Sequence, residues 1–392
     1  AEAMIMAYNS RSRNKVKANA NKFFVSNKIF PQTLDLLKTR SAPLGIELVI
    51  GCHEEFAGDE NFFGGIIQYP DGFGQVNDYK AFVEKMHALE GLVVVATDLM
   101  SLVLLTPPGE WGADIVVGSS QRFGVPMGYG GPHAAFLATK EEFKRNMPGR
   151  IIGISIDAEG KPALRMALQT REQHIKREKA TSNICTAQAL LAIMAGMYAV
   201  YHGPDGLRKI ARNINVLTGV LASEVEKYGY LQQNTAFFDT LKIELPTSTS
   251  IDRLRALALE QKINFRYIDE KTIGISLDET TSLGDVNLIL CVLAQAAGRV
   301  CSEYICKPAE CEKIETFPAS FKRTSDFLTH PVFNTYHSET SMMRYIKKLE
   351  NRDLALNRTM IPLGSCTMKL NAAVEMFALS WPEFNALHPF VP

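Results

Sequence analysis

The sequence has no excess of charge and no long apolar run. Its 392 residues hold 42 Lys and Arg against 42 Asp and Glu, so the formal net charge is zero. A neutral chain has no field to draw it to nucleic acid or an anionic membrane, and we expect neither as a partner. Without a run of about 18 apolar residues, no transmembrane helix is predicted. The first seven residues lack the basic segment and apolar core of a signal peptide, and they look like a helix already under way.

Cysteine is scarce. Seven cysteines, an odd number scattered over 392 residues, favour reduced thiols and a reducing compartment over a disulfide framework. Cys301, Cys306 and Cys311 recur at five-residue intervals, but no fourth cysteine or histidine adjoins them at the spacing of a zinc site. We therefore predict no metal, and the role of these three cysteines stays open.

The apolar residues are ample and regularly placed. Hydrophobic residues make up 46% of the chain, enough for a large core and for two or three domains. Short β-branched runs alternate with amphipathic helices over residues 22–138, which predicts an α/β fold with a mainly parallel sheet covered on both faces. The expected strands cover residues 22–26, 46–50, 65–69, 92–97, 113–119 and 134–138, and the expected helices cover residues 31–39 and 78–89.

The pattern divides the chain into three parts. Residues 1–204 form the large domain and end in an apolar helix at 187–200, which we expect to be buried. Residues 205–298, a long helix followed by interleaved strands and helices, form a small α+β domain. Residues 299–392 begin with a segment rich in cysteine, lysine, proline and serine, which we interpret as a linker that crosses the molecule.

One acidic residue stands where a cofactor would be bound. Asp98 follows the strand at 92–97, and Gln121 follows the strand at 113–119. Ligands of open parallel sheets lie at the carboxyl ends of strands, so both residues should face one crevice. A carboxylate there can pair with the ring nitrogen of pyridoxal phosphate, whose aldehyde is held by a lysine as a Schiff base. Gln121 stands where that lysine is expected, and an amide cannot form an aldimine.

We therefore interpret Asp98 as part of a vestigial site with no covalent anchor. The alternative is that Asp98 caps a helix or turn and Gln121 is an ordinary loop residue, because carboxylates are common at caps. Lys179 and Lys369 are other lysines to consider, but Lys179 lies in a basic segment that we expect to be exposed. That segment, residues 165–179, is either a surface for an anionic partner or subunit, or a solvated helix face.

Neither histidines nor glycines add a second site. His133 and His174 have no serine, cysteine or carboxylate at a convincing spacing, so we expect them in the core or in polar networks. The glycines at 128–131 lack the strand, turn and helix order of a nucleotide site, and we expect them to let the backbone reverse.

Several long sequence strings carry a resemblance. They are SSQRFGVPMGYGGPH at 119–133, MPGRIIG at 147–153, QTREQHI at 169–175, EKATSNICT at 178–186 and PLGSCTMKLN at 362–371. Together they resemble the amino-terminal half of the glycine-cleavage system P-protein family. The resemblance implies the aminotransferase-like fold (pyridoxal phosphate fold type I) in each half of the protein, with the Schiff-base lysine in the carboxyl-terminal half. It also implies that this chain is an internal piece that stops short of that lysine.

The resemblance assigns further roles. The string at 362–371 opens the catalytic half, so Ser365, Cys366, Thr367 and Lys369 are expected to line or support its pocket. The whole protein would use pyridoxal phosphate to decarboxylate glycine and pass the aminomethyl group to the lipoyl arm of the H-protein, in bacterial cytoplasm or mitochondrial matrix.

The present piece would be an inactive scaffold that does not bind the cofactor covalently and that pairs with the catalytic half or forms a homodimer. Two alternatives stay open: an aminotransferase-like enzyme that uses another lysine, and a docking module for a lipoyl carrier protein.

Overall fold

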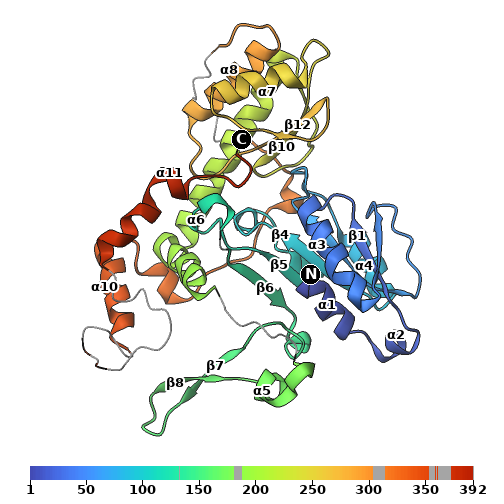
Figure 1. Ribbon diagram of the computed structural model, residues 1–392, viewed down its shortest axis with the longest axis vertical. Helices are drawn as coiled ribbons and strands as arrows, with labels where there is room; N and C mark the ends of the chain where they lie inside the picture. Colours follow the sequence, from blue (N-terminus) through green and yellow to red (C-terminus); the bar gives the residue numbers. More distant parts are fainter. Residues whose placement is uncertain are drawn as a thin grey trace.

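The computed structural model describes residues 1–131, 133–180, 188–302, 314–352, 358, 360 and 372–391. Two sheets and a separate hairpin organise these residues (Figure 1). The large sheet has the order β2-β1-β3-β4-β5-β6, in which the first five strands are parallel and β6 is antiparallel to β5. Its strands are β1 (Lys22–Ser26), β2 (Glu47–Gly51), β3 (Phe62–Tyr69), β4 (Leu92–Thr97), β5 (Ile115–Ser119) and β6 (Ala135–Thr139).

Helices cover both faces of the large sheet because successive side chains of each strand point to opposite faces. Phe23 of β1 packs on one side with Met4 of the helix α1 (Glu2–Asn9). Phe24 packs on the other side with Phe82 of the helix α4 (Lys80–Ala88). The remaining helices near this sheet are α2 (Arg13–Lys17) and α3 (Pro31–Ser41). The predicted parallel sheet with two covered faces is therefore confirmed.

One long helix joins the two sheets. The helix α6 (Ala189–Val225) bends at Gly203, whose φ of 60° and neighbour Pro204 interrupt the regular backbone. Its middle contributes Leu207 to the large core and its end contributes Leu221 to the small core. The first turns depart from the expected burial, because Leu190 is 68% exposed and lies outside both cores. That expectation was wrong for this part of the helix.

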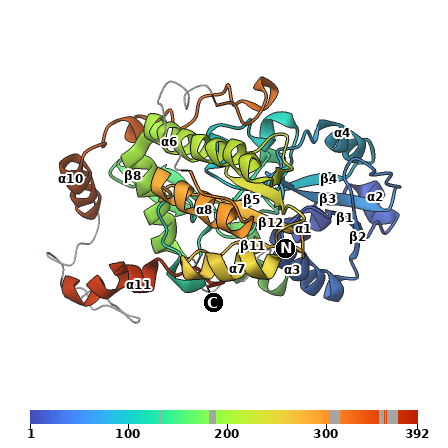
Figure 2. The same cartoon turned by 90° about the horizontal axis from the view of Figure 1, so that it is seen from above.

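The small sheet has the order β11-β12-β10-β9 and is antiparallel. Its strands β11 and β12 are labelled in Figure 2. Ser282 and Asp285 form a capping box that begins the helix α8, which buries its apolar face against this sheet. The interleaved strands and helices expected for this part of the chain are present, although two of the strands are only two residues long. The elements are β9 (Leu231–Gln232), β10 (Thr240–Glu244), α7 (Ile251–Glu260), β11 (Arg266–Tyr267), β12 (Thr272–Ser276) and α8 (Leu283–Ala296).

After α8 the described chain returns to the large sheet. Phe237 N donates to Thr316 O at 2.9 Å beside the small sheet, and Thr106 N donates to Phe321 O at 2.8 Å beside the large one. The segment then leads to the helix α10 (Glu339–Glu350), the 3-10 helix η12 (Ala373–Ser380) and the short helix α11 (Pro382–Asn385). The division of the chain into residues 1–204, 205–298 and 299–392 stays a proposal.

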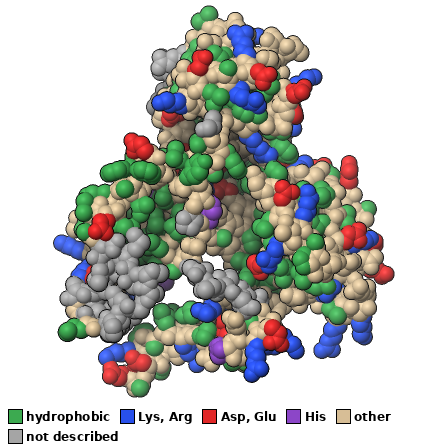
Figure 3. Space-filling view, in the orientation of Figure 1, with side chains coloured by type: hydrophobic (Ala, Val, Ile, Leu, Met, Phe, Trp, Pro, Cys, Tyr) green, Lys and Arg blue, Asp and Glu red, His purple; other side chains and the backbone are tan. Residues whose placement is uncertain are grey.

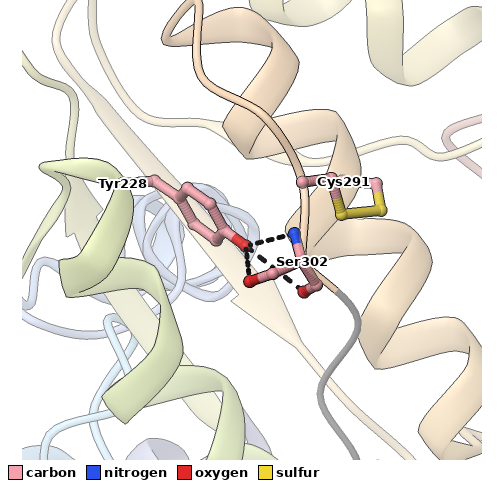
Figure 4. Close-up of a disulfide and its surroundings, with 4 residues drawn as sticks. Tyr228, Cys291 and Ser302 are labelled. Atoms are coloured by element: carbon pink, nitrogen blue, oxygen red, sulfur yellow. Dashed lines mark hydrogen bonds between the residues drawn. A yellow bond between two sulfur atoms is a disulfide. The ribbon is translucent and has the colours of Figure 1, made fainter.

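A disulfide joins Cys291 of α8 to Cys301 (Figure 4). Beside it, Ser302 N donates to the Tyr228 hydroxyl at 3.2 Å. This bond holds the chain after α8 against the 3-10 helix η8 (Glu226–Tyr228), which directly follows α6. The expectation of reduced thiols was wrong for these two cysteines, because an odd total does not prevent one close pair from bonding. Cys301 is therefore not a free metal ligand, whereas Cys306 and Cys311 lie outside the described residues.

Candidate functional site

Asp98 lies at the carboxyl end of β4, where its backbone leaves the sheet. Its carboxylate accepts a hydrogen bond from Ser101 N at 2.8 Å, and Ser101 Oγ donates to Asp98 O at 2.8 Å. These bonds hold the turn that leads into the short 3-10 helix η2 (Ser101–Val103), whose N-cap position is Met100. The capping alternative therefore describes part of what Asp98 does.

The side chain that reaches Asp98 is Arg122, in the loop after β5. Its Nη1 lies 3.6 Å from Asp98 Oδ2 and 2.6 Å from Asp239 Oδ2, and its Nε lies 3.9 Å from Glu279 Oε2. Asp239 immediately precedes β10 and Glu279 follows β12. The guanidinium thus connects the end of the large sheet with two loops of the small sheet, and we call these four residues the Arg122 cluster.

Burial and charge act against each other in the Arg122 cluster. Burial disfavours the charged guanidinium, but the nearby carboxylates of Asp98, Asp239 and Glu279 outweigh it and raise the pKa of Arg122. Burial also raises the pKa of the Asp98 carboxyl, which the Arg122 charge opposes and the Asp239 charge reinforces. Arg122 therefore stays a cation, and its charge only partly offsets the effect of burial, so the pKa of Asp98 remains above its ordinary value.

Gln121 makes its hydrogen bonds next to the end of β5. Its backbone N–H donates to Ser119 Oγ at 3.1 Å, and its side-chain Nε2 donates to Pro126 O at 3.4 Å, so both bonds stay within its own loop. The structure brings the neighbouring residue Arg122 to Asp98 instead. Over the part of the chain that the structure describes, no lysine forms an ion pair with Asp98, and Lys179 is exposed.

Of the other residues singled out from the sequence, four lie outside the described part of the chain and one lies elsewhere. Ser365, Cys366, Thr367 and Lys369 lie outside the described residues. His174 borders a hollow beside Arg150, in a part of the chain away from the Arg122 cluster.

Sequence reasoning missed Arg122, and a signal for it existed. Asp98 and Arg122 follow neighbouring strands, so opposite charges at these two ends should have been paired. The ring of Phe123, the next residue, lies 5.7 Å from that of Tyr198 on α6, which fixes the loop from the other side. Gly124 has a φ of 75°, and a Cβ there would lie 2.6 Å from the Tyr198 ring. The loop that carries Arg122 is thus held against α6.

Comparisons with known proteins give the chain its relatives. The family model described as glycine cleavage system P-protein matches residues 1–293. The chain belongs to the P-protein family. The resemblance expected from the sequence strings is therefore confirmed.

The relatives of this P-protein chain carry the name glycine dehydrogenase (decarboxylating). That of Flavobacterium johnsoniae is 57% identical over 392 residues, which are 100% of this chain and 40% of the relative. That of Nostoc punctiforme is 54% identical over 394 residues, again with 100% and 40% covered. The chain thus spans about 40% of the length of these curated relatives.

Solved structures agree on the fold. An inhibitor-bound crystal structure of glycine decarboxylase (P-protein) of the glycine cleavage system matches with a TM-score of 0.67 and 29% identity, over 75% of this chain and 68% of that one. The sphingosine-1-phosphate lyase of Burkholderia pseudomallei matches with a TM-score of 0.54 and 11% identity, over 75% and 67%. The aminotransferase-like (pyridoxal phosphate fold type I) architecture is confirmed. No described helix is both long and apolar enough to cross a bilayer.

Proposed function

We propose that this chain is the half of a P-protein that lacks the Schiff-base lysine, and that it serves the other half as a scaffold. The full-length protein would decarboxylate glycine with pyridoxal phosphate and pass the aminomethyl group to the lipoyl arm of the H-protein. The names of the relatives support this activity for proteins more than twice as long as this chain. Their bacterial sources favour the cytoplasm over the mitochondrial matrix.

The observation that carries the proposal is the ion pair between Arg122 and Asp98. Pyridoxal phosphate needs a carboxylate for its protonated ring nitrogen and a lysine for its aldehyde. Arg122 Nη1 already lies 3.6 Å from Asp98 Oδ2, so the protonated ring of the cofactor would have to displace the guanidinium in order to pair with Asp98. Gln121 is hydrogen-bonded within its own loop and has no amine to offer. The residues present therefore do not fit the cofactor.

Glycine decarboxylation with H-protein tests the proposal. We expect the full-length protein to release carbon dioxide from glycine when pyridoxal phosphate and lipoylated H-protein are supplied, and we expect residues 1–392 alone to release none. Release by residues 1–392 alone would favour an independent enzyme that uses another lysine. If the full-length protein is inactive but still captures H-protein, the docking-module alternative holds instead.

A further inference from the structure

The hairpin of β7 (Ile152–Ile156) and β8 (Pro162–Met166) is a two-stranded sheet of its own that extends away from both larger sheets (Figure 1). Asp157 N donates to Lys161 O at 2.9 Å and closes the turn, where Gly160 adopts a φ of 80°. A hairpin of two strands is barely stable in water unless one face is covered. This ribbon therefore needs a surface to pack on.

One face of the ribbon is entirely apolar. Residues directly opposite each other in an antiparallel pair share a face. The register places Ile152 opposite Met166, Ile154 opposite Leu164 and Ile156 opposite Pro162, and these six residues form what we call the isoleucine face. The other face carries Gly153, Ser155, Ala163 and Arg165.

The isoleucine face is exposed in this chain. Ile154 is 83%, Leu164 75% and Ile156 73% exposed. Apolar residues that alternate in this way along strands normally mark the side that faces a core. At its Met166 end the face adjoins a hollow of about 400 Å³ that is also lined by Arg150 and His174. Ile193 of α6 and Trp381, which precedes α11, are exposed as well. Figure 3 shows apolar side chains gathered over the part of the molecule where Figure 1 draws α6 and α11.

The surroundings of the isoleucine face are basic. Residues 144–180 hold nine Lys and Arg against four Asp and Glu in a chain whose total charge is zero. Two copies of this arm packed face to face would bring like charges together, which disfavours self-association. The fitting partner surface is apolar with an acidic rim.

We propose that the isoleucine face of the β7–β8 hairpin is the docking surface for the carboxyl-terminal half of the full-length protein. This proposal rests on the proposed function, in which the chain is one half of a longer P-protein. More than half of the length of the relatives lies outside the region that this chain matches, so in the proposed full-length protein a partner of sufficient size would lie on the same polypeptide. A tethered partner is also present at a high effective concentration, unlike a second copy.

Hydrogen–deuterium exchange tests the surface directly. We expect the backbone amides of β7 and β8 to exchange at least about tenfold more slowly in the full-length protein than in residues 1–392 alone, because docking protects the ribbon. The variant Ile154→Asp of the full-length protein should lose this protection. The variant Ser155→Asp adds the same charge on the other face and should keep it.

Equally fast exchange in both wild-type proteins would overturn the proposal, and so would equal loss in the two variants. Protection that appears in residues 1–392 alone as their concentration rises would assign the face to a second copy and overturn it as well. If Ile154→Asp also unfolds the large sheet, the wild-type comparison decides by itself. Release of carbon dioxide from glycine, measured separately on the wild-type full-length protein, tells a failed docking surface from a failed function.

Discussion

Arg122 Nη1 lies 2.6 Å from Asp239 Oδ2, although 117 positions separate the two residues in the chain. Arg122 leaves the large sheet after β5, and Asp239 enters the small sheet before β10. The same guanidinium also lies near Asp98, so a single cation connects three structural features: the end of β4, the loop after β5 and the loops beside the two central strands of the small sheet. In the proposed function, this internal contact takes the place where pyridoxal phosphate would pair with Asp98.

Replacing Arg122 by leucine should destabilise the protein at neutral pH. The substitution leaves the carboxylates of Asp98, Asp239 and Glu279 facing one another without a cation, and we expect the free energy of unfolding to fall by about 3 kcal/mol. Without Arg122 the pKa of Asp98 rises further. In the variant, Asp98 then binds a proton more tightly in the folded state than in the unfolded state, and acidification stabilises the folded state. The loss of stability relative to the wild type should therefore shrink as the pH falls.

Urea unfolding of the wild type and of Arg122→Leu at pH 7 and pH 5 measures this loss. The control is Lys38→Ala, which removes an exposed pair with Asp35 at 3.2 Å and should cost less than about 1 kcal/mol. If Arg122→Leu costs no more than the control, the cluster does not stabilise the junction.

Asp114, at the opposite end of β5, should make stability depend on acid pH. Burial would raise the pKa of Asp114, but bonds from His87, Lys140 and the Val93 amide outweigh it and lower that pKa. A carboxyl with a lowered pKa stabilises the fold above its ordinary pKa of 3.8, and that contribution is lost as the pH falls through the lowered value.

We expect Asp114→Asn to lower the free energy of unfolding by about 2 kcal/mol at pH 7, because the amide cannot accept all three bonds. The difference from the wild type should shrink below pH 4. Guanidinium unfolding curves at several pH values measure it, and a difference that grows on acidification would show that Asp114 is not the group responsible.

Alanine substitutions at two glycines should distinguish the cost of backbone strain from the cost of a steric clash. Gly45 and Gly74 have φ values of 64° and 84°, so alanine is strained at both. A Cβ at Gly45 would meet nothing within 4 Å, whereas one at Gly74 would lie 2.2 Å from Thr240 O. Gly45→Ala should cost about 1 kcal/mol. Gly74→Ala should cost clearly more, because the loop after β3 would be pushed off β10. Thermal unfolding compares the two, and equal losses would mean that this loop yields without cost.

The sequence predicted the strands of the large sheet better than the side-chain contacts between the two sheets. Apolar runs located the strands β1 to β6 because burial imposes their pattern locally. The pairing of Arg122 with Asp239 depends on the packing of two sheets, which no local pattern shows. The Cys291–Cys301 bond was missed because a count of cysteines says nothing about which two lie close together. The β7–β8 hairpin was missed although Ile152, Ile154 and Ile156 alternate with small residues, because these residues were given no element and the basic segment that begins at Arg165 was considered only as a partner surface or a helix face.

The central claim is that the site beside Asp98 has no amine with which to hold pyridoxal phosphate. The measurement is to add the cofactor to residues 1–392, reduce with borohydride and map any labelled peptide by mass spectrometry, with the full-length protein treated in parallel. We predict no labelled lysine within residues 1–392 in either protein, and a labelled lysine in the carboxyl-terminal half of the full-length protein. A stoichiometric phosphopyridoxyl group on a lysine of residues 1–392, formed in the absence of the other half, would contradict the account.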